Sequence, residues 1–112
     1  MLITDLSKIE FKTVLVPAPE FGENAEIKLR ELSGAQHAEL IDRLKNAEFR
    51  DSEKALTAFM LYNCLVREDG GRMLQNEDEA VNLMDSIPAG LLRRINAALA
   101  GLNEQDNPEK KG

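Results

Sequence analysis

In the segment 25–32, apolar and charged residues alternate from Ala25 to Arg30, with Ile27 and Leu29 among the apolar positions. A period of two is that of a β-strand with one buried and one solvated face. A second segment, residues 11–17, is rich in β-branched residues and ends at a proline, which cannot donate a hydrogen bond to a sheet. The stretch between them, residues 17–24, has the composition of turns. Together these segments predict an antiparallel hairpin with a long loop.

After the hairpin, apolar residues recur at helical spacing. Ser33 has the side chain of a helix cap, and Gln36 follows three residues later, as a capping box requires. This first helix fades near Asn46, and Gly101 is expected to end the last one. The apolar stripes of the four expected helices are Leu40, Ile41 and Leu44; the run Ala55 to Val66; Ala80, Val81, Leu83 and Met84; and Leu91, Leu92, Ile95, Ala98, Leu99 and Leu102.

These elements predict an α+β fold that is mostly α: an N-terminal antiparallel β-hairpin followed by about four helices. A length of 112 residues allows one domain at most. We expect an N-terminal extension at residues 1–11, which has no clear period, and a single α-rich domain at residues 12–102. Residues 103–112 are polar and predict a flexible tail.

The most informative feature is the long apolar segment from Ala55 to Val66, in which only Thr57 and Asn63 interrupt the apolar residues. A helix that is apolar nearly all round is either central to its own domain or partly covered by a second chain. The sequence leaves both interpretations open. Under the second, the candidate protein-interaction residues on this helix are Leu56, Phe59, Met60 and Tyr62. The basic pair Arg93 and Arg94 is a separate candidate, because it fits either a solvated helix face or a contact with a partner.

Charge and composition narrow the class of partner. The formal net charge is -6, without a basic patch, which disfavours binding to nucleic acid. No apolar run approaches the roughly 20 residues that span a bilayer, and residues 1–12 lack the pattern of a signal peptide. A single cysteine excludes an internal disulfide. We therefore expect a protein that stays in the cytoplasm, with no nucleic-acid or membrane partner.

Residues suited to catalysis are few. His37 is the only histidine, and it falls on the solvated side of the first helix. Cys64 lies inside the most apolar helix, where a thiolate is disfavoured. The acidic run 77–79 lacks the spacing of a calcium loop and is typical of a helix start. These observations predict a protein that is not an enzyme and uses no cofactor or metal.

The order of elements resembles that of the tail assembly chaperones of long-tailed, siphovirus-type bacteriophages. The resemblance lies in residues 12–17 (KTVLVP), residues 25–32 (AEIKLREL) and the capped helix after them, and in residues 64–74 (CLVREDGGRML) with the two helices that follow. It covers about residues 12–107. The loop at residues 17–24 is longer and richer in proline than the family pattern, and residues 1–11 have no counterpart.

This resemblance implies a helper protein of the bacterial host cytoplasm that is absent from the mature virion. Such proteins self-associate, and they bind and solubilise the tape measure protein before the tail tube forms around it. A frameshifted longer form recruits the tail tube protein in many phages. The alternative, motivated by the -6 charge, is a small acidic regulatory or antitoxin-like protein that neutralises a basic partner.

Overall fold

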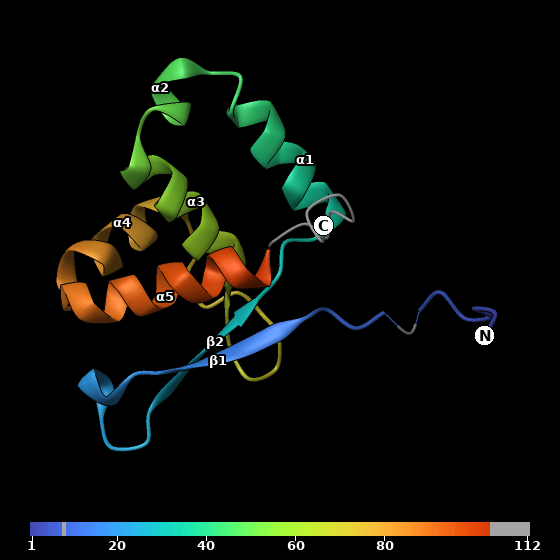
Figure 1. Ribbon diagram of the computed structural model, residues 1–112, viewed down its shortest axis with the longest axis horizontal. Coiled ribbons are helices and arrows are strands. Elements are labelled where there is room, and N and C mark those ends of the chain that lie inside the picture. The colour runs from blue at the N-terminus through green and yellow to red at the C-terminus, as the bar shows by residue number, and fades with distance from the viewer. Residues whose placement is uncertain (8, 104–112) are drawn as a thin grey trace, which may run out of the picture.

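The computed structural model describes residues 1–7 and 9–103 and has the expected α+β, mostly α architecture (Figure 1). Its elements, in chain order, are β1 (Thr13–Pro17), the 3-10 helix η1 (Pro19–Phe21), β2 (Glu26–Arg30), α1 (Gly34–Arg43), α2 (Ala47–Arg50), α3 (Glu53–Cys64), β3 (Leu65–Val66), α4 (Glu77–Ser86) and α5 (Ala89–Leu102). Within the described residues, no helix is both long enough and apolar enough to cross a membrane.

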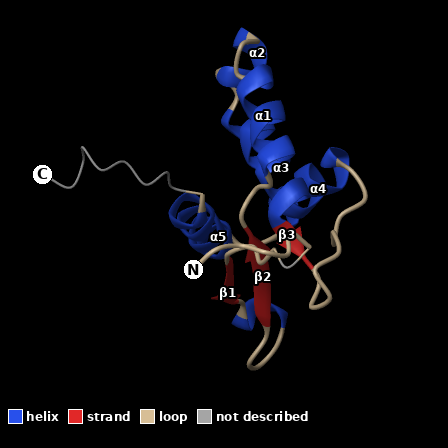
Figure 2. Cartoon of the chain, turned by 90° about the vertical axis from the view of Figure 1, so that its right-hand side faces the viewer, coloured by secondary structure: helices blue, strands red, loops and turns tan. Residues whose placement is uncertain are grey.

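The predicted hairpin is confirmed. β1 and β2 pair antiparallel, with Thr13 opposite Arg30 and Val16 opposite Ile27. The register places Val14 and Val16 of β1 and Ile27 and Leu29 of β2 on the face that packs against the core, because side chains alternate between the two faces of a sheet. Leu15 lies on the other face and is 55% exposed. In Figure 2 the helices α1, α2 and α3 rise away from the sheet, while α5 lies beside it.

The sheet has a third strand, β3, that the sequence pattern did not predict. The helix expected to reach Val66 ends at Cys64, and Leu65 and Val66 pair antiparallel with Leu29 and Lys28 of β2. Both residues of β3 are buried. The expectation was wrong at this end because a short apolar run fits a buried strand as well as a buried helix.

Two other helix ends differ from the expectation. The first helix ends at Arg43, and Asn46 then caps a separate short helix, α2, by accepting from the backbone N–H groups of Glu48 and Phe49. Gly101 lies inside α5 rather than ending it. The predicted capping box is present, because Ser33 and Gln36 each satisfy a backbone N–H group of the other.

The core lies between the sheet and three helices, α3, α4 and α5. Of the predicted stripe on α5, one residue in each turn is buried, namely Leu91, Ile95 and Leu99, and α4 contributes Ala80. The packed residues are Val16, Ala18, Leu29, Ala58, Leu61, Cys64, Leu65, Ala80, Leu91, Ile95 and Leu99. α1, by contrast, has no buried residue, so it is attached at the edge of the domain.

Candidate functional site

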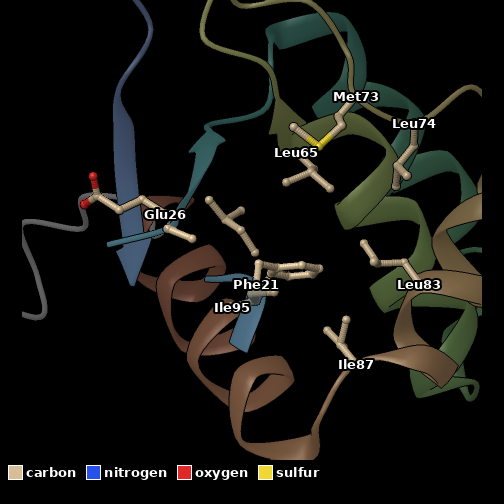
Figure 3. Close-up of a pocket in the computed structure, with 10 residues that line it drawn as sticks. Phe21, Glu26, Leu65, Met73, Leu74, Leu83, Ile87 and Ile95 are labelled. Carbon is tan, nitrogen blue, oxygen red and sulfur yellow. The ribbon is translucent and has the colours of Figure 1, made fainter. Parts of the chain in front are cut away.

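An apolar groove opens between the β-hairpin and the C-terminal helices, with a volume of about 270 Å³. Figure 3 shows apolar side chains that converge on one space from the hairpin, β3, α4 and α5, while the carboxylate of Glu26 points away from it. The lining residues are Phe21, Ala25, Glu26, Ile27, Leu65, Met73, Leu74, Leu83, Ile87 and Ile95. Glu26 is the only charged residue among them.

One wall of the groove is the loop between β1 and β2, which carries Phe21 on η1. A cation of α5 holds this loop in place: Arg94 donates to the backbone carbonyl of Pro17 and pairs with the carboxylate of Glu20. The loop closes on itself through the N–H of Ala18, which donates to the carbonyl of Ala25 at 2.8 Å. Phe21 therefore faces the groove from a fixed loop, although 60% of its surface is exposed.

The opposite wall is the segment after β3, which carries Met73 and Leu74. It turns at Gly70, whose φ of 90° is a conformation that glycine adopts without a steric penalty. The N–H of Arg67 donates to the carbonyl of Gly71 at 2.8 Å, and the N–H of Met73 donates to Leu65 at 3.2 Å. These hydrogen bonds hold residues 71–73 beside β3. Met73 therefore lies at the groove, with half of its surface exposed.

A buried polar contact also anchors this wall. Asn63 is 2% exposed, and its amide oxygen accepts from the guanidinium of Arg72 at 2.8 Å. The same guanidinium donates to the Tyr62 hydroxyl at 2.9 Å and lies 4.4 Å from the centre of the Tyr62 ring. Because a buried amide without a partner is costly, Arg72 is held close to α3, and Met73 beside it is held at the groove.

The groove can bind a partner through apolar contacts, because its lining side chains are apolar except for Glu26. Its floor is made by Leu65 and Ile95, both buried, and by the half-buried residues Leu83 and Ile87 of α4 and the segment after it. Among the described residues, no group of three or more His, Cys, Asp or Glu side chains is placed to hold a metal ion. Burial raises the pKa of the Cys64 thiol to about 11, so this residue is protonated at neutral pH.

The structure separates the residues that the sequence marked for interaction. Phe59 is fully buried, and its ring lies 6.1 Å from that of Phe49 and 4.8 Å from the guanidinium of Arg43. Leu56, Met60 and Tyr62 are half-buried on α3. In the described structure, Phe59 therefore contacts its own chain, and the candidate set does not form one exposed surface.

The basic pair on α5 is also divided. Arg93 is exposed, whereas Arg94 is engaged with Pro17 and Glu20 of its own chain. The arginine that the sequence offered as a partner contact is thus a structural link between α5 and the hairpin loop. Arg93 keeps an exposed guanidinium.

Most of the groove residues were not singled out from the sequence. Phe21 lies in a proline-rich loop, and Met73 follows a glycine turn, so neither belongs to a periodic apolar stripe. Large apolar residues inside segments with the composition of turns were the available signal, since loops usually carry polar residues on the surface. Leu83 belongs to a predicted stripe but was assigned to the core.

The fold is that of a solved structure, the bacteriophage HK97 tail assembly chaperone. The two superpose with a TM-score of 0.57 at 21% sequence identity, over 90% of this chain and 93% of that one. No family model matches the chain, and no curated protein matches it. At this level of identity the similarity shows a shared fold along nearly the whole chain.

Proposed function

We propose that this chain is a phage tail assembly chaperone, which binds the tape measure protein through the apolar groove. Two observations support the proposal. The first is the shared fold, which extends over 90% of the chain. The second is the chemistry of the groove, which offers apolar surface and no arrangement of groups suited to catalysis.

The single observation that carries the proposal is the accessible apolar lining at the mouth of the groove. Phe21 and Met73 both line it, from two different loops, with 60% and 50% of their surfaces exposed. A long helical client presents apolar side chains at intervals of three and four residues, and such side chains bind in grooves of this kind. Methionine adapts to side chains of different shape, as a client with many similar segments requires.

The proposal includes the setting in which such a helper acts. It acts in the cytoplasm of the bacterial host, self-associates along the client, and is absent from the mature virion. Recruitment of the tail tube protein belongs to a longer, frameshifted form of the same protein. The role requires no cofactor, no nucleic acid and no membrane.

Co-expression with the tape measure protein of the same phage tests the proposal. We expect the client to be soluble with the wild-type chain and insoluble without it. Met73→Glu places a charge at the groove and should return most of the client to the insoluble fraction. Ile41→Glu is the matched control, because Ile41 is 48% exposed on α1, away from the groove, and this variant should solubilise the client as the wild type does.

The proposal fails if the client is equally insoluble with and without the wild-type chain. Salt distinguishes it from the acidic regulatory partner suggested by the net charge of -6. Binding through apolar contacts should persist at about 1 M salt, where the Debye length falls to roughly 3 Å. Binding that is lost at this salt concentration favours the regulatory partner.

A further inference from the structure

The two chain segments that flank the apolar groove carry negative charge only. The hairpin loop, residues 17–26, forms one wall and contains Glu20, Glu23 and Glu26 but no lysine or arginine. The helix α4 supplies Leu83 to the lining, and every charged residue on this helix is acidic. The net charge of -6 is therefore not spread evenly, because these two segments contain carboxylates and no compensating cation of their own.

Part of this charge is neutralised by other elements of the chain. Glu20 pairs with Arg94 of α5, and one carboxylate at each end of α4 pairs with a cation of α1 or α3. Within residues 1–7 and 9–103, by contrast, no lysine or arginine lies within ion-pair distance of Glu23 or Glu26. Both side chains are exposed, and together they form an acidic rim on the hairpin side of the groove.

Glu26 is the member of the acidic rim that borders the groove directly. It is one of the lining residues, and its carboxylate points outward rather than into the apolar space (Figure 3). Lys28 lies on the same face of β2, but its ammonium group donates to the backbone carbonyl of Glu68 at 3.3 Å. The Glu26 carboxylate is therefore open to a cation on a partner that lies over the groove.

The opposite wall of the groove is also flanked by a carboxylate. Glu79 lies one turn before Leu83 on α4, and its carboxylate accepts from the N–H of Gln75 at 2.7 Å. The arginine on this side, Arg72, precedes Met73, and its guanidinium donates to two side chains of α3. In the described part of the chain, acidic groups thus flank the groove on both sides.

An apolar groove with an acidic border fits a partner of defined chemistry. Apolar side chains of a helix enter such a groove when they recur at intervals of three and four residues. A lysine or arginine at the edge of that apolar stripe then meets the acidic rim, whereas an acidic residue at the same place is repelled. Because exposed ion pairs each contribute little, charge selects among apolar segments and does not replace the apolar contacts.

We propose that the groove selects client segments by charge: it binds amphipathic helices whose apolar stripe is bordered by lysine or arginine, and Glu26 and Glu23 pair with these cations. The inference rests on the proposed function, since the occupant is a helical segment of the same client. It adds the charge that such a segment carries and the residues of this chain that determine the preference.

Two synthetic peptides test this selection. Both are amphipathic helices with the same leucine stripe, and the positions that border the stripe are lysine in one peptide and glutamate in the other. In fluorescence anisotropy with the full chain, the lysine-bordered peptide should bind about fivefold more tightly at about 0.1 M salt, where the Debye length is roughly 10 Å. At about 1 M salt the preference should fall below about twofold, while both peptides still bind through their leucines.

Matched variants assign the preference to the acidic rim. Glu23→Gln with Glu26→Gln should weaken binding of the lysine-bordered peptide about fivefold and leave the glutamate-bordered peptide bound no more weakly. The control, Glu48→Gln with Glu53→Gln, removes the same charge from exposed positions on α2 and α3 and should keep the preference. Met73→Gln makes the groove less apolar without adding charge and should weaken binding of both peptides. All the substituted side chains are exposed, so folding should be unaffected, and thermal unfolding of each variant checks this.

Four results overturn the proposal: no binding of either peptide, binding of the glutamate-bordered peptide that is equal or tighter, equal weakening by the rim variant and its control, or unchanged binding by Met73→Gln. The client test is separable from this one. If the rim selects the lysine-bordered peptide but the tape measure protein stays insoluble, the charge selection stands and the proposed function fails. If the client is solubilised but the two peptides bind equally, the charge selection fails and the proposed function stands.

Discussion

Arg43 and Glu77 form a two-pronged ion pair that ties α1 to the start of α4. Arg43 Nη1 donates to Glu77 Oε1 at 2.6 Å, and Nη2 donates to Oε2 at 2.8 Å. The same guanidinium lies over the ring of the buried Phe59. Since α1 has no buried residue of its own, this pair is a principal attachment of α1 to the domain.

Removing Arg43 should therefore release α1. We expect Arg43→Ala to lower the free energy of unfolding by about 1–2 kcal/mol, since a bidentate, half-shielded pair and a cation–π contact are lost together. Lys45→Ala is the control: Lys45 is highly exposed and pairs with Asp42 only at 3.8 Å, so its loss should cost less than about 0.5 kcal/mol. Urea unfolding measures both. Equal effects of the two variants would contradict the assigned role of Arg43.

The second prediction separates two adjacent arginines. Arg94→Ala removes the link from α5 to Pro17 and Glu20, so we expect a loss of about 1–2 kcal/mol in stability and faster hydrogen exchange in the loop that carries Phe21. Arg93→Ala should change stability by less than about 0.5 kcal/mol, because Arg93 is exposed. Hydrogen exchange that is unchanged in Arg94→Ala would show that the loop is held by other contacts.

These two arginines also show what the sequence could and could not predict. Alternation in residues 25–30 and the capping motif at Ser33 depend on neighbours along the chain, so the hairpin and α1 were predicted well. The partners of Arg94 are Glu20 and Pro17, which lie 74 and 77 residues away along the chain, and no feature of the sequence around Arg94 indicates them. From the sequence, the pair Arg93 and Arg94 therefore fits a solvated helix face or a partner contact, and neither interpretation includes a contact with the hairpin loop of its own chain.

The end of α3 and the groove were missed for a similar reason. Leu65 and Val66 continue the apolar run of the helix, and only the hydrogen bonds offered by β2 turn them into a strand. Phe21 and Met73 are near neighbours only because the hairpin loop and the segment after β3 fold against α4 and α5. Periodicity identifies the buried face of an element, but it cannot identify a groove that four elements build together.

The third prediction concerns the pH dependence of stability. Burial raises the pKa of the Cys64 thiol from 9.0 to about 11, so between these values the unfolded chain releases the thiol proton while the folded chain retains it. The free energy of unfolding must therefore fall as pH rises from 9 to 11, and the thiol accounts for roughly 2–3 kcal/mol of this loss. Cys64→Ala lacks the titrating thiol and keeps every other side chain, so the difference in stability between the two proteins isolates the contribution of the thiol.

Urea unfolding of the wild type and of Cys64→Ala at intervals from pH 8 to pH 11 checks this prediction. The difference in stability between the two proteins should be constant below pH 9 and should then shift in favour of Cys64→Ala. A thiol-specific reagent should react slowly with the folded wild type at pH 8. Rapid reaction at that pH would show that the thiol is accessible and that the assigned cause of its raised pKa is wrong.

The central claim is that the groove between the hairpin and the C-terminal helices is where the client binds. Its most direct test is methyl nuclear magnetic resonance of the labelled chain, titrated with a soluble apolar helical segment of the tape measure protein. We predict that the largest shift changes fall on Met73, Leu83 and Ile87, and that Met73→Glu weakens binding at least tenfold. Shift changes confined to Ile41 and the rest of α1, with unchanged binding by Met73→Glu, would contradict the claim.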